Sequence, residues 1–210
     1  MTTMALKLTV PRAAQPVTLA EAKLHLRVDS SDEDALISAL IVAATDDAEH
    51  LMGRAVLTQR WQLTLDAFNA PPPSGQLVAP ASTPDEIALQ RPPVTSVVSV
   101  KYLQASDGVL TTLAPSEYTL AAASDYTARL VPAWGKSWPA TRDMPEAVQI
   151  VFECGYADAA SVPENIKAWI KLRVGSLYAN REQWTTGRNI TIAPNPFIDC
   201  LLDRYRAWVM

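Results

Sequence analysis

From Ser161 to Tyr178 the chain reads SVPENIKAWIKLRVGSLY, and this stretch predicts a long amphipathic helix. Ser161 and Glu164 have the spacing of a capping box. Pro163 suits a first turn, where an amide hydrogen would have no intrahelical partner. The apolar residues recur at steps of three and four, which places them on one stripe of the helix. That stripe comprises Ile166, Trp169, Ile170, Val174, Leu177 and Tyr178.

A short polar loop separates this helix from a second one, which we predict near residues 196 to 208. Its apolar residues are Phe197, Ile198, Leu201, Leu202, Tyr205 and Trp208. A helix of this length cannot bury so much apolar surface by itself. We therefore expect it to pack on another element or on a partner.

Two further helices are predicted near the start of the chain. Thr18 and Glu21 repeat the capping-box spacing before a short helix at 19–27. Residues 30–32 (Ser, Ser, Asp) offer caps for a longer helix, and Gly53 suits its C-terminal end. The apolar stripe of this longer helix comprises Leu36, Ile37, Leu40, Ile41, Ala44, Ala48 and Leu51.

The period of the apolar residues then changes to two, which is typical of strands with one buried face. Strands are predicted at 57–66, 86–90, 95–103, 109–113, 126–131 and 147–154. Asp107-Gly108 is a good hairpin turn between two of them. Several prolines between 70 and 94 predict that strands there are short or lie at sheet edges.

The order of elements, helices then strands then helices, predicts an α+β protein. The outer helices each carry a stripe that needs a partner, so the economical arrangement packs them on one another. We expect a helical bundle formed by the N- and C-terminal helices, residues 1–55 and 157–210. An antiparallel β domain, residues 56–156, would be inserted between its two halves.

Composition excludes several classes of protein. The 210 residues are 49% apolar and 19% charged, which favours a globular chain with a real core. A net charge of −4 argues against a protein that grips nucleic-acid backbone. We find no apolar run long enough to cross a bilayer and no signal peptide, so we expect a cytoplasmic protein.

No catalytic, cofactor-binding or metal-binding set is predicted. The two histidines, His25 and His50, lack flanking catalytic residues, and glycine-rich phosphate loops are absent. Cys154 and Cys200 lie far apart without metal-ligand spacing, so each is expected to be a buried free thiol. We therefore do not expect an enzyme.

Two groups of residues leave alternatives open. Trp134 and Trp138 suit either a carbohydrate platform or an aromatic loop that covers the sheet, and we favour the loop. Arg181, Arg188 and Arg204 suit contacts with phosphates or with a partner's carboxylates, and we favour the partner.

The two ends of the chain resemble a known family. PVTLAEAKLHLRV from Pro16 and DEDALISALI from Asp32 resemble the start of the tailed-phage head-tail connector family, also found in prophages and gene transfer agents. VPENIKAWIKLRVGSLYANRE from Val162 is similar to the late helix of that family. Weaker likeness lies in RPPVTSV from Arg91 and in Gly155-Tyr. The smaller members of the family are nearly all helical, so the β domain is a departure that suits a separate binding role.

The resemblance implies a structural protein of the virion neck, made in the cytoplasm of the bacterial host. Such a connector forms a ring, usually of twelve copies, beneath the portal protein and extends the DNA channel. It presents a surface to the tail or to a stopper or tail-terminator protein. Double-stranded DNA passes through without specific binding, and neither a cofactor nor a membrane takes part. The alternative is a carbohydrate- or host-binding module carried on the β domain.

Two sets of site residues follow from this resemblance. The loop after the long helix and the last helix are expected to bind the portal or a neighbouring subunit. This predicted partner-binding set is Arg181, Thr186, Arg188, Asn189, Ile190, Ile192, Phe197, Tyr205 and Trp208. A channel wall should carry acidic and neutral side chains so that DNA does not stick. The predicted channel-facing residues are Asp46, Asp47 and Glu49.

Overall fold

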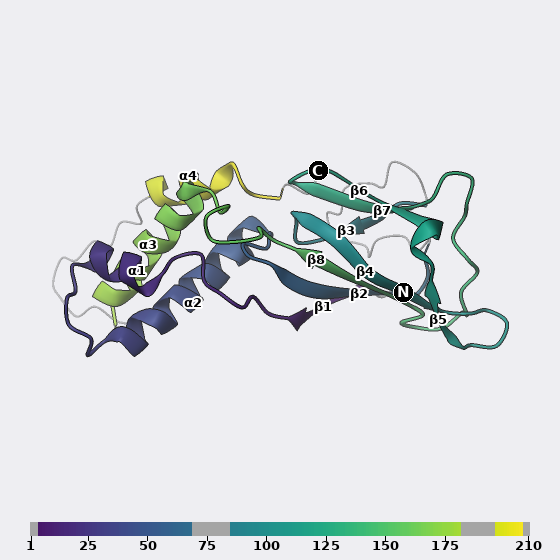
Figure 1. Cartoon of the computed structure of the whole chain (residues 1–210), viewed down its shortest axis with the longest axis horizontal. Coiled ribbons are helices and arrows are strands. Elements are labelled where there is room, and N and C mark those ends of the chain that lie inside the picture. The colour runs from purple at the N-terminus through teal and green to yellow at the C-terminus, as the bar shows by residue number, and fades with distance from the viewer. Residues whose placement is uncertain (1–3, 69–84, 182–195, 208–210) are drawn as a thin grey trace. The chain divides into compact units, whose positions relative to one another are not determined.

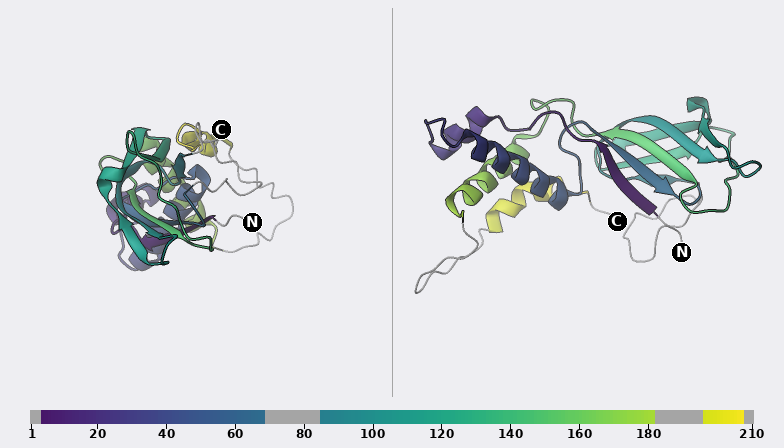
Figure 2. Two further views of the ribbon diagram at one scale, coloured as in Figure 1. Left: turned by 90° about the vertical axis from the view of Figure 1, so that its right-hand side faces the viewer. Right: turned by 90° about the horizontal axis from the view of Figure 1, so that it is seen from below.

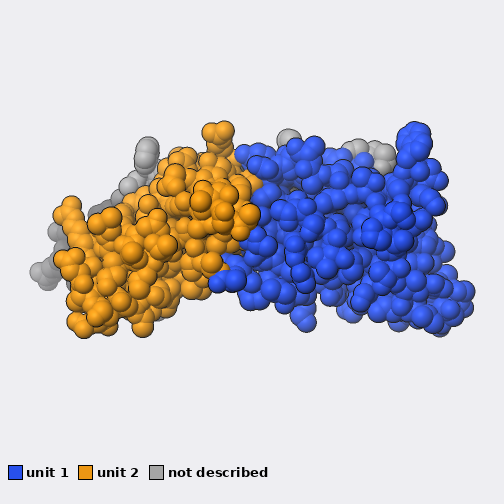
Figure 3. Space-filling model, viewed as in Figure 1, with its two compact units in different colours: residues 1–13, 58–155, 207–210 blue, residues 14–57, 156–206 orange. Residues whose placement is uncertain are grey.

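A computed structural model describes residues 4–68, 85–181 and 196–207 of the chain (Figure 1), with the side chains of 196–199 left out. The protein is α+β, as predicted. It divides into two compact units, coloured separately in Figure 3. The helical unit consists of residues 14–57 and 156–206, and the β unit consists of residues 1–13, 58–155 and 207–210.

The described part of the helical unit contains α1 (Leu19–Leu26), α2 (Asp34–Met52), α3 (Glu164–Ala179) and α4 (Pro196–Asp203). α2 and α4 both pack on α3, and α1 contacts α2 and α3. The long predicted stripes meet in one core. Its largest members include Ile37, Ile41, Met52, Ile166, Trp169, Ile170 and Leu202.

Two residues of the predicted α2 stripe do not join this core. Leu36 is 37% exposed and Leu51 is 43% exposed. Their inclusion in the buried face was therefore wrong. Leu51 lies at the border of the buried face, and Leu36 lies beyond that border on the outer side of α2. A helical wheel alone does not decide which neighbour covers either side chain.

The helix ends agree with the sequence patterns in part. The capping box before α1 is formed, because the Glu21 amide donates to Thr18 Oγ1 at 3.2 Å and the Thr18 amide donates to Glu21 Oε2 at 2.7 Å. α2 ends at Gly53, whose φ of 66° is in the left-handed region that favours glycine. The predicted caps at residues 30–32 are not used, since α2 has Glu33 at its N-cap without a side-chain hydrogen bond.

The predicted capping box at α3 is also not formed. Ser161 donates from its amide and from its hydroxyl to Asp158 Oδ1, at 2.8 Å each. Its side chain is thus engaged upstream, and the helix begins at Glu164 without a side-chain cap. A nearby carboxylate competed successfully for the serine, as side chains at helix starts commonly do.

The described part of the β unit contains two antiparallel sheets, seen from two further sides in Figure 2. The five-stranded sheet has the order β1 (Met4–Val10), β2 (Gln59–Leu65), β8 (Val148–Cys154), β4 (Val94–Leu103), β5 (Leu110–Leu113). The three-stranded sheet has the order β3 (Ile87–Leu89), β7 (Thr127–Pro132), β6 (Tyr118–Ser124), with a short 3₁₀ helix, η1 (Pro115–Glu117), before β6. The interior of the β unit is formed by fully buried side chains from both sheets: Leu63, Val100, Leu130, Ile150 and Phe152.

The six predicted strands are present, and the predicted hairpin joins β4 to β5. Leu103 pairs with Leu110, Gly108 has a φ of 71°, and Asp107 Oδ1 accepts a hydrogen bond from the Val109 amide at 2.9 Å. β1 and β6 were not predicted. Because β1 pairs with β2, residues 1–13 group with the β unit and not with the helical unit to which we assigned residues 1–55.

The two cysteines have different environments. Cys154 is buried, as expected, at the end of β8. Cys200 is exposed, which contradicts the prediction of a buried thiol. It lies in α4, whose buried residues are set by contact with α3.

Candidate partner interface

The end of α3 is fastened to the start of α2 by three polar residues. Arg181 Nη2 lies 2.7 Å from Glu33 Oε1, and the Tyr178 hydroxyl donates to Glu33 Oε2. The Arg181 guanidinium also stacks over the Tyr178 ring, 4.6 Å from its centroid. We call these residues, Glu33, Tyr178 and Arg181, the α3 anchor. Arg181 was predicted to bind a partner, and in this structure it holds the α3 terminus in place.

The electrostatics of the α3 anchor follow from its geometry. The Tyr178 hydroxyl and then the Arg181 guanidinium lower the pKa of Glu33, because both stabilise the carboxylate. The same carboxylate raises the pKa of Tyr178, whose ionisation would place two anions in contact. The anchor is therefore strongest between mildly acidic and mildly basic pH.

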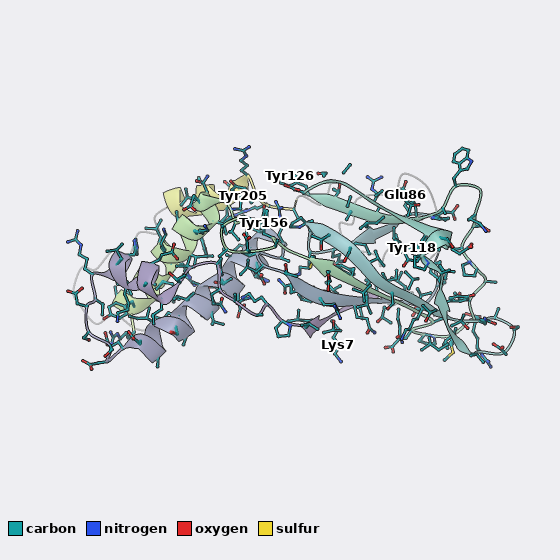
Figure 4. All side chains as sticks on the ribbon, viewed as in Figure 1. Lys7, Glu86, Tyr118, Tyr126, Tyr156 and Tyr205 are labelled. Atoms are coloured by element: carbon teal, nitrogen blue, oxygen red, sulfur yellow. The ribbon has the colours of Figure 1, made fainter. Side chains whose placement is uncertain are left out.

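A buried arginine connects the end of α2 to the segment that follows α4. Arg54 is 2% exposed and follows the Gly53 cap. Its guanidinium donates to the Tyr205 carbonyl and to the Tyr156 hydroxyl, at 3.4 Å each, and lies 5.9 Å from the centroid of the Tyr156 ring. Tyr156 and Tyr205 are labelled in Figure 4. Tyr205, a predicted partner-binding residue, is thus half-buried and contacts the helical core.

The remaining predicted partner-binding residues lie where the structure gives no side-chain description. Thr186, Arg188, Asn189, Ile190, Ile192 and Trp208 fall outside the described residues. Phe197 belongs to α4, and its side chain is not described. The structure does establish that both described flanks of 182–195 are attached to the helical unit, through the α3 anchor and through α4.

The three predicted channel-facing residues have three different environments. Asp46 is exposed. Asp47 pairs with Arg173 of α3, with its Oδ2 2.9 Å from Nη2. Glu49 is 8% exposed, and its Oε1 accepts a hydrogen bond from the Val56 amide at 2.9 Å. A channel-facing role for Glu49 is therefore contradicted, because its carboxylate points into the unit to satisfy a buried backbone donor.

The two tryptophans of the β unit also differ. Trp138 stacks on Phe68, with centroids 4.6 Å apart, and its indole nitrogen donates to the Asp85 carbonyl at 2.7 Å. It covers the sheet, as we favoured. Trp134 is fully exposed, at 102%, on a turn closed by the Lys136 amide and the Ala133 carbonyl at 2.9 Å. The covering role therefore does not extend to Trp134.

Two other kinds of feature, a metal site and a membrane span, are absent from the described residues. No group of three or more metal-ligating side chains lies close enough there to hold an ion. Within the same part of the chain, no helix has the length and apolar character to cross a membrane.

Comparison with known proteins connects this fold to one family. Residues 16–101 match the model of the phage gp6-like head-tail connector protein family. This match includes both quoted N-terminal segments, so the resemblance to head-tail connectors is confirmed. No curated protein is significantly similar to the chain.

Three solved chains share the fold over nearly the whole length. One, from the neck of an empty gene transfer agent (GTA) particle computed with C6 symmetry, has a TM-score of 0.74 and 22% identity, covering 97% of this chain and 96% of that chain. A second chain, from the virion of a native GTA particle, has a TM-score of 0.72 and 21% identity. The match covers 97% of this chain and 95% of that chain. A third chain, from the neck of a native GTA particle computed with C12 symmetry, has a TM-score of 0.70 and 22% identity. The match covers 98% of this chain and 96% of that chain.

Proposed function

We propose that this protein is a structural head-tail connector of a tailed phage, a prophage or a gene transfer agent. The observation that carries the proposal is the fold match to a GTA neck chain, which covers 97% of this chain and so includes both units. The family match at residues 16–101 supports the same role from sequence. The protein would then lie in the virion neck after synthesis in the bacterial cytoplasm.

In this role the chain forms a ring, which we propose to contain twelve copies, under the portal protein. The C6 and C12 symmetries of the similar necks support a cyclic arrangement. The helical bundle would contact the portal, with the β domain inserted between its halves. A tail protein or a stopper or tail-terminator protein would bind below, and the role requires no catalysis and no cofactor.

We propose that the segment between the α3 anchor and α4 is the portal-binding element, together with α4 itself. Both flanks of this segment are fastened to the helical unit through Glu33, Tyr178, Arg181 and α4. Anchored flanks lower the entropy lost when a segment docks, which favours binding. Deleting residues 186–193 should abolish portal binding while the melting temperature of the free protein stays nearly unchanged. Retained binding would move the docking surface elsewhere.

For the DNA channel we propose Asp46 as the wall residue, because its side chain is exposed. Asp47, which pairs with Arg173, is the second candidate. The net charge of −4 suits a channel through which DNA slides.

The experiment that tests the proposed function is deletion of the gene followed by electron microscopy of the particles. We expect DNA-filled capsids that fail to join tails, and complementation in trans should restore tailed particles. Normal tailed particles from the deletion strain would refute the connector role. Purified protein should also co-sediment with portal rings. It should not bind soluble glycans, whereas a carbohydrate-binding module would bind them.

A further inference from the structure

α2 has a second apolar face that points away from the core of the helical unit. Its buried face includes Ile37, Ile41 and Ala44. On the opposite side of its first half, five consecutive exposed positions of the helical wheel are all apolar: Ala35, Leu36, Ala39, Val42 and Ala43. Helices that are apolar all round are normally buried on all sides. We call these five residues the α2 outer face.

A different element of the same unit carries an isolated protruding side chain. Leu24 of α1 is 82% exposed, whereas Ala22 of the same helix is fully buried in the core. A leucine at this exposure contributes little to the stability of the free unit. The helical unit thus has two distinct apolar surfaces, one a broad row of small side chains and the other a single large one.

The exposed charges beside these two surfaces have opposite signs. Asp32, which precedes the α2 outer face, is exposed, and so is Arg27, which follows Leu24. Glu21, one turn before Leu24, is held at the α1 cap by Thr18 and keeps its negative charge. Arg27 places a positive charge one turn after Leu24, and Asp32 places a negative charge at the start of the α2 outer face.

We propose that Leu24 and Arg27 of one copy dock on the α2 outer face and Asp32 of the next copy. This inference rests on the proposed ring. Closed rings need two different, mutually complementary surfaces on each subunit. Leu24 and Ala35 lie on either side of the α1–α2 connection at residues 27–33, so both surfaces belong to the same part of the helical unit.

A second copy fits these surfaces better than an unrelated partner does. Alanines at positions 35, 39 and 43 allow close approach of another helix, and the isolated leucine of the neighbour fills the space between them. The Asp32 and Arg27 charges then approach at the border of the contact, where they favour this orientation over its reverse.

Cysteine cross-linking tests the contact. In a Cys200→Ser background, which removes the exposed native thiol, the double variant Leu24→Cys with Ala39→Cys is treated with a short bis-maleimide. Purified protein and assembled particles are both examined. We expect a ladder of covalent oligomers from the double variant and only monomers from each single variant. A dimer from Ala39→Cys alone would show a symmetric α2–α2 contact and would overturn the proposal, as would the absence of any ladder in both samples.

Charge-reversal variants of Arg27 and Asp32 test the same contact independently. Arg27→Glu and Asp32→Arg should each reduce the ladder, and the two changes together should restore it. Failure of the double reversal to restore the ladder would remove this charge pair from the contact. Ser116→Glu, at an exposed position of the β unit, is the control and should leave the ladder unchanged. Failure of the connector role can be told apart from failure of this contact. If the connector role is wrong, the protein is absent from particle necks, whatever the cross-linking of purified protein shows.

Discussion

Glu49 of α2 accepts a hydrogen bond from the amide of Val56 at 2.9 Å, and both residues are buried. The chain leaves α2 between them, after the Gly53 cap, so this bond fixes the exit of α2. Glu49, which we predicted from the sequence to face the channel, is thus a structural acceptor inside the unit.

Replacing Glu49 should therefore destabilise the helical unit. Glu49→Ala leaves the Val56 amide without its acceptor, and we expect the free energy of unfolding to fall by about 1–3 kcal/mol, the usual cost of a buried unsatisfied donor. Urea denaturation followed by circular dichroism measures this change. The control is His50→Ala on the exposed side of the same helix, expected within about 0.5 kcal/mol of the wild type. Equal stabilities of both variants would contradict the structural role.

Trp169 should contribute more to the free energy of unfolding than an exposed tryptophan does. It is 3% exposed in the helical core, so Trp169→Ala should cost about 3–5 kcal/mol, the range for truncating a large buried aromatic side chain. Thermal unfolding tests the prediction. Trp134→Ala removes the same atoms from a fully exposed position and should leave the melting temperature nearly unchanged. An unchanged melting temperature for Trp169→Ala would place this side chain outside the core.

The α3 anchor should weaken in acid. The pKa of Glu33 is lowered in the folded protein by Tyr178 and Arg181, so its stabilising contribution is present above the ordinary value of 4.5 and is lost as the pH falls through the folded pKa. NMR titration of the Glu33 side chain should give a pKa below 4.5. In Glu33→Gln, the decline in stability on acidification should be shallower. A normal pKa at Glu33 would argue against the anchor in solution.

Asp46 should influence passage of DNA if it lines the channel. Asp46→Lys adds a phosphate contact, so DNA ejection should become slower in particles that still assemble. The effect should decline as salt rises, because salt screens exposed charges. Ser38→Lys, elsewhere on α2, is the comparison variant. Ejection at the wild-type rate in low salt would exclude Asp46 from the channel wall.

Much of the secondary structure was predictable from local patterns. The three- and four-residue steps of Ile166, Trp169 and Ile170 identify α3, and the alternation around Leu63 identifies β2. The Thr18 capping box and the Gly53 cap needed only their own neighbours. Family resemblance at the two ends added the function that no catalytic motif supplied. Each of these signals is local, so the sequence carries it in full.

Tertiary contacts decided the rest. β6, with three consecutive alanines, has weak intrinsic strand preference and exists because it pairs with β7. β1 likewise depends on β2, about fifty residues away in sequence, which is why residues 1–13 group with the strands. The Ser161 hydroxyl donates to Asp158, and the Glu49 carboxylate accepts from the Val56 amide. The sequence by itself determined the α-helices and the six strands that we predicted, because periodicity and caps act over one or two turns. Only the folded chain decided the strands β1 and β6 and the two polar contacts, because their partners lie on other strands or beyond a helix end, where propensity does not specify them.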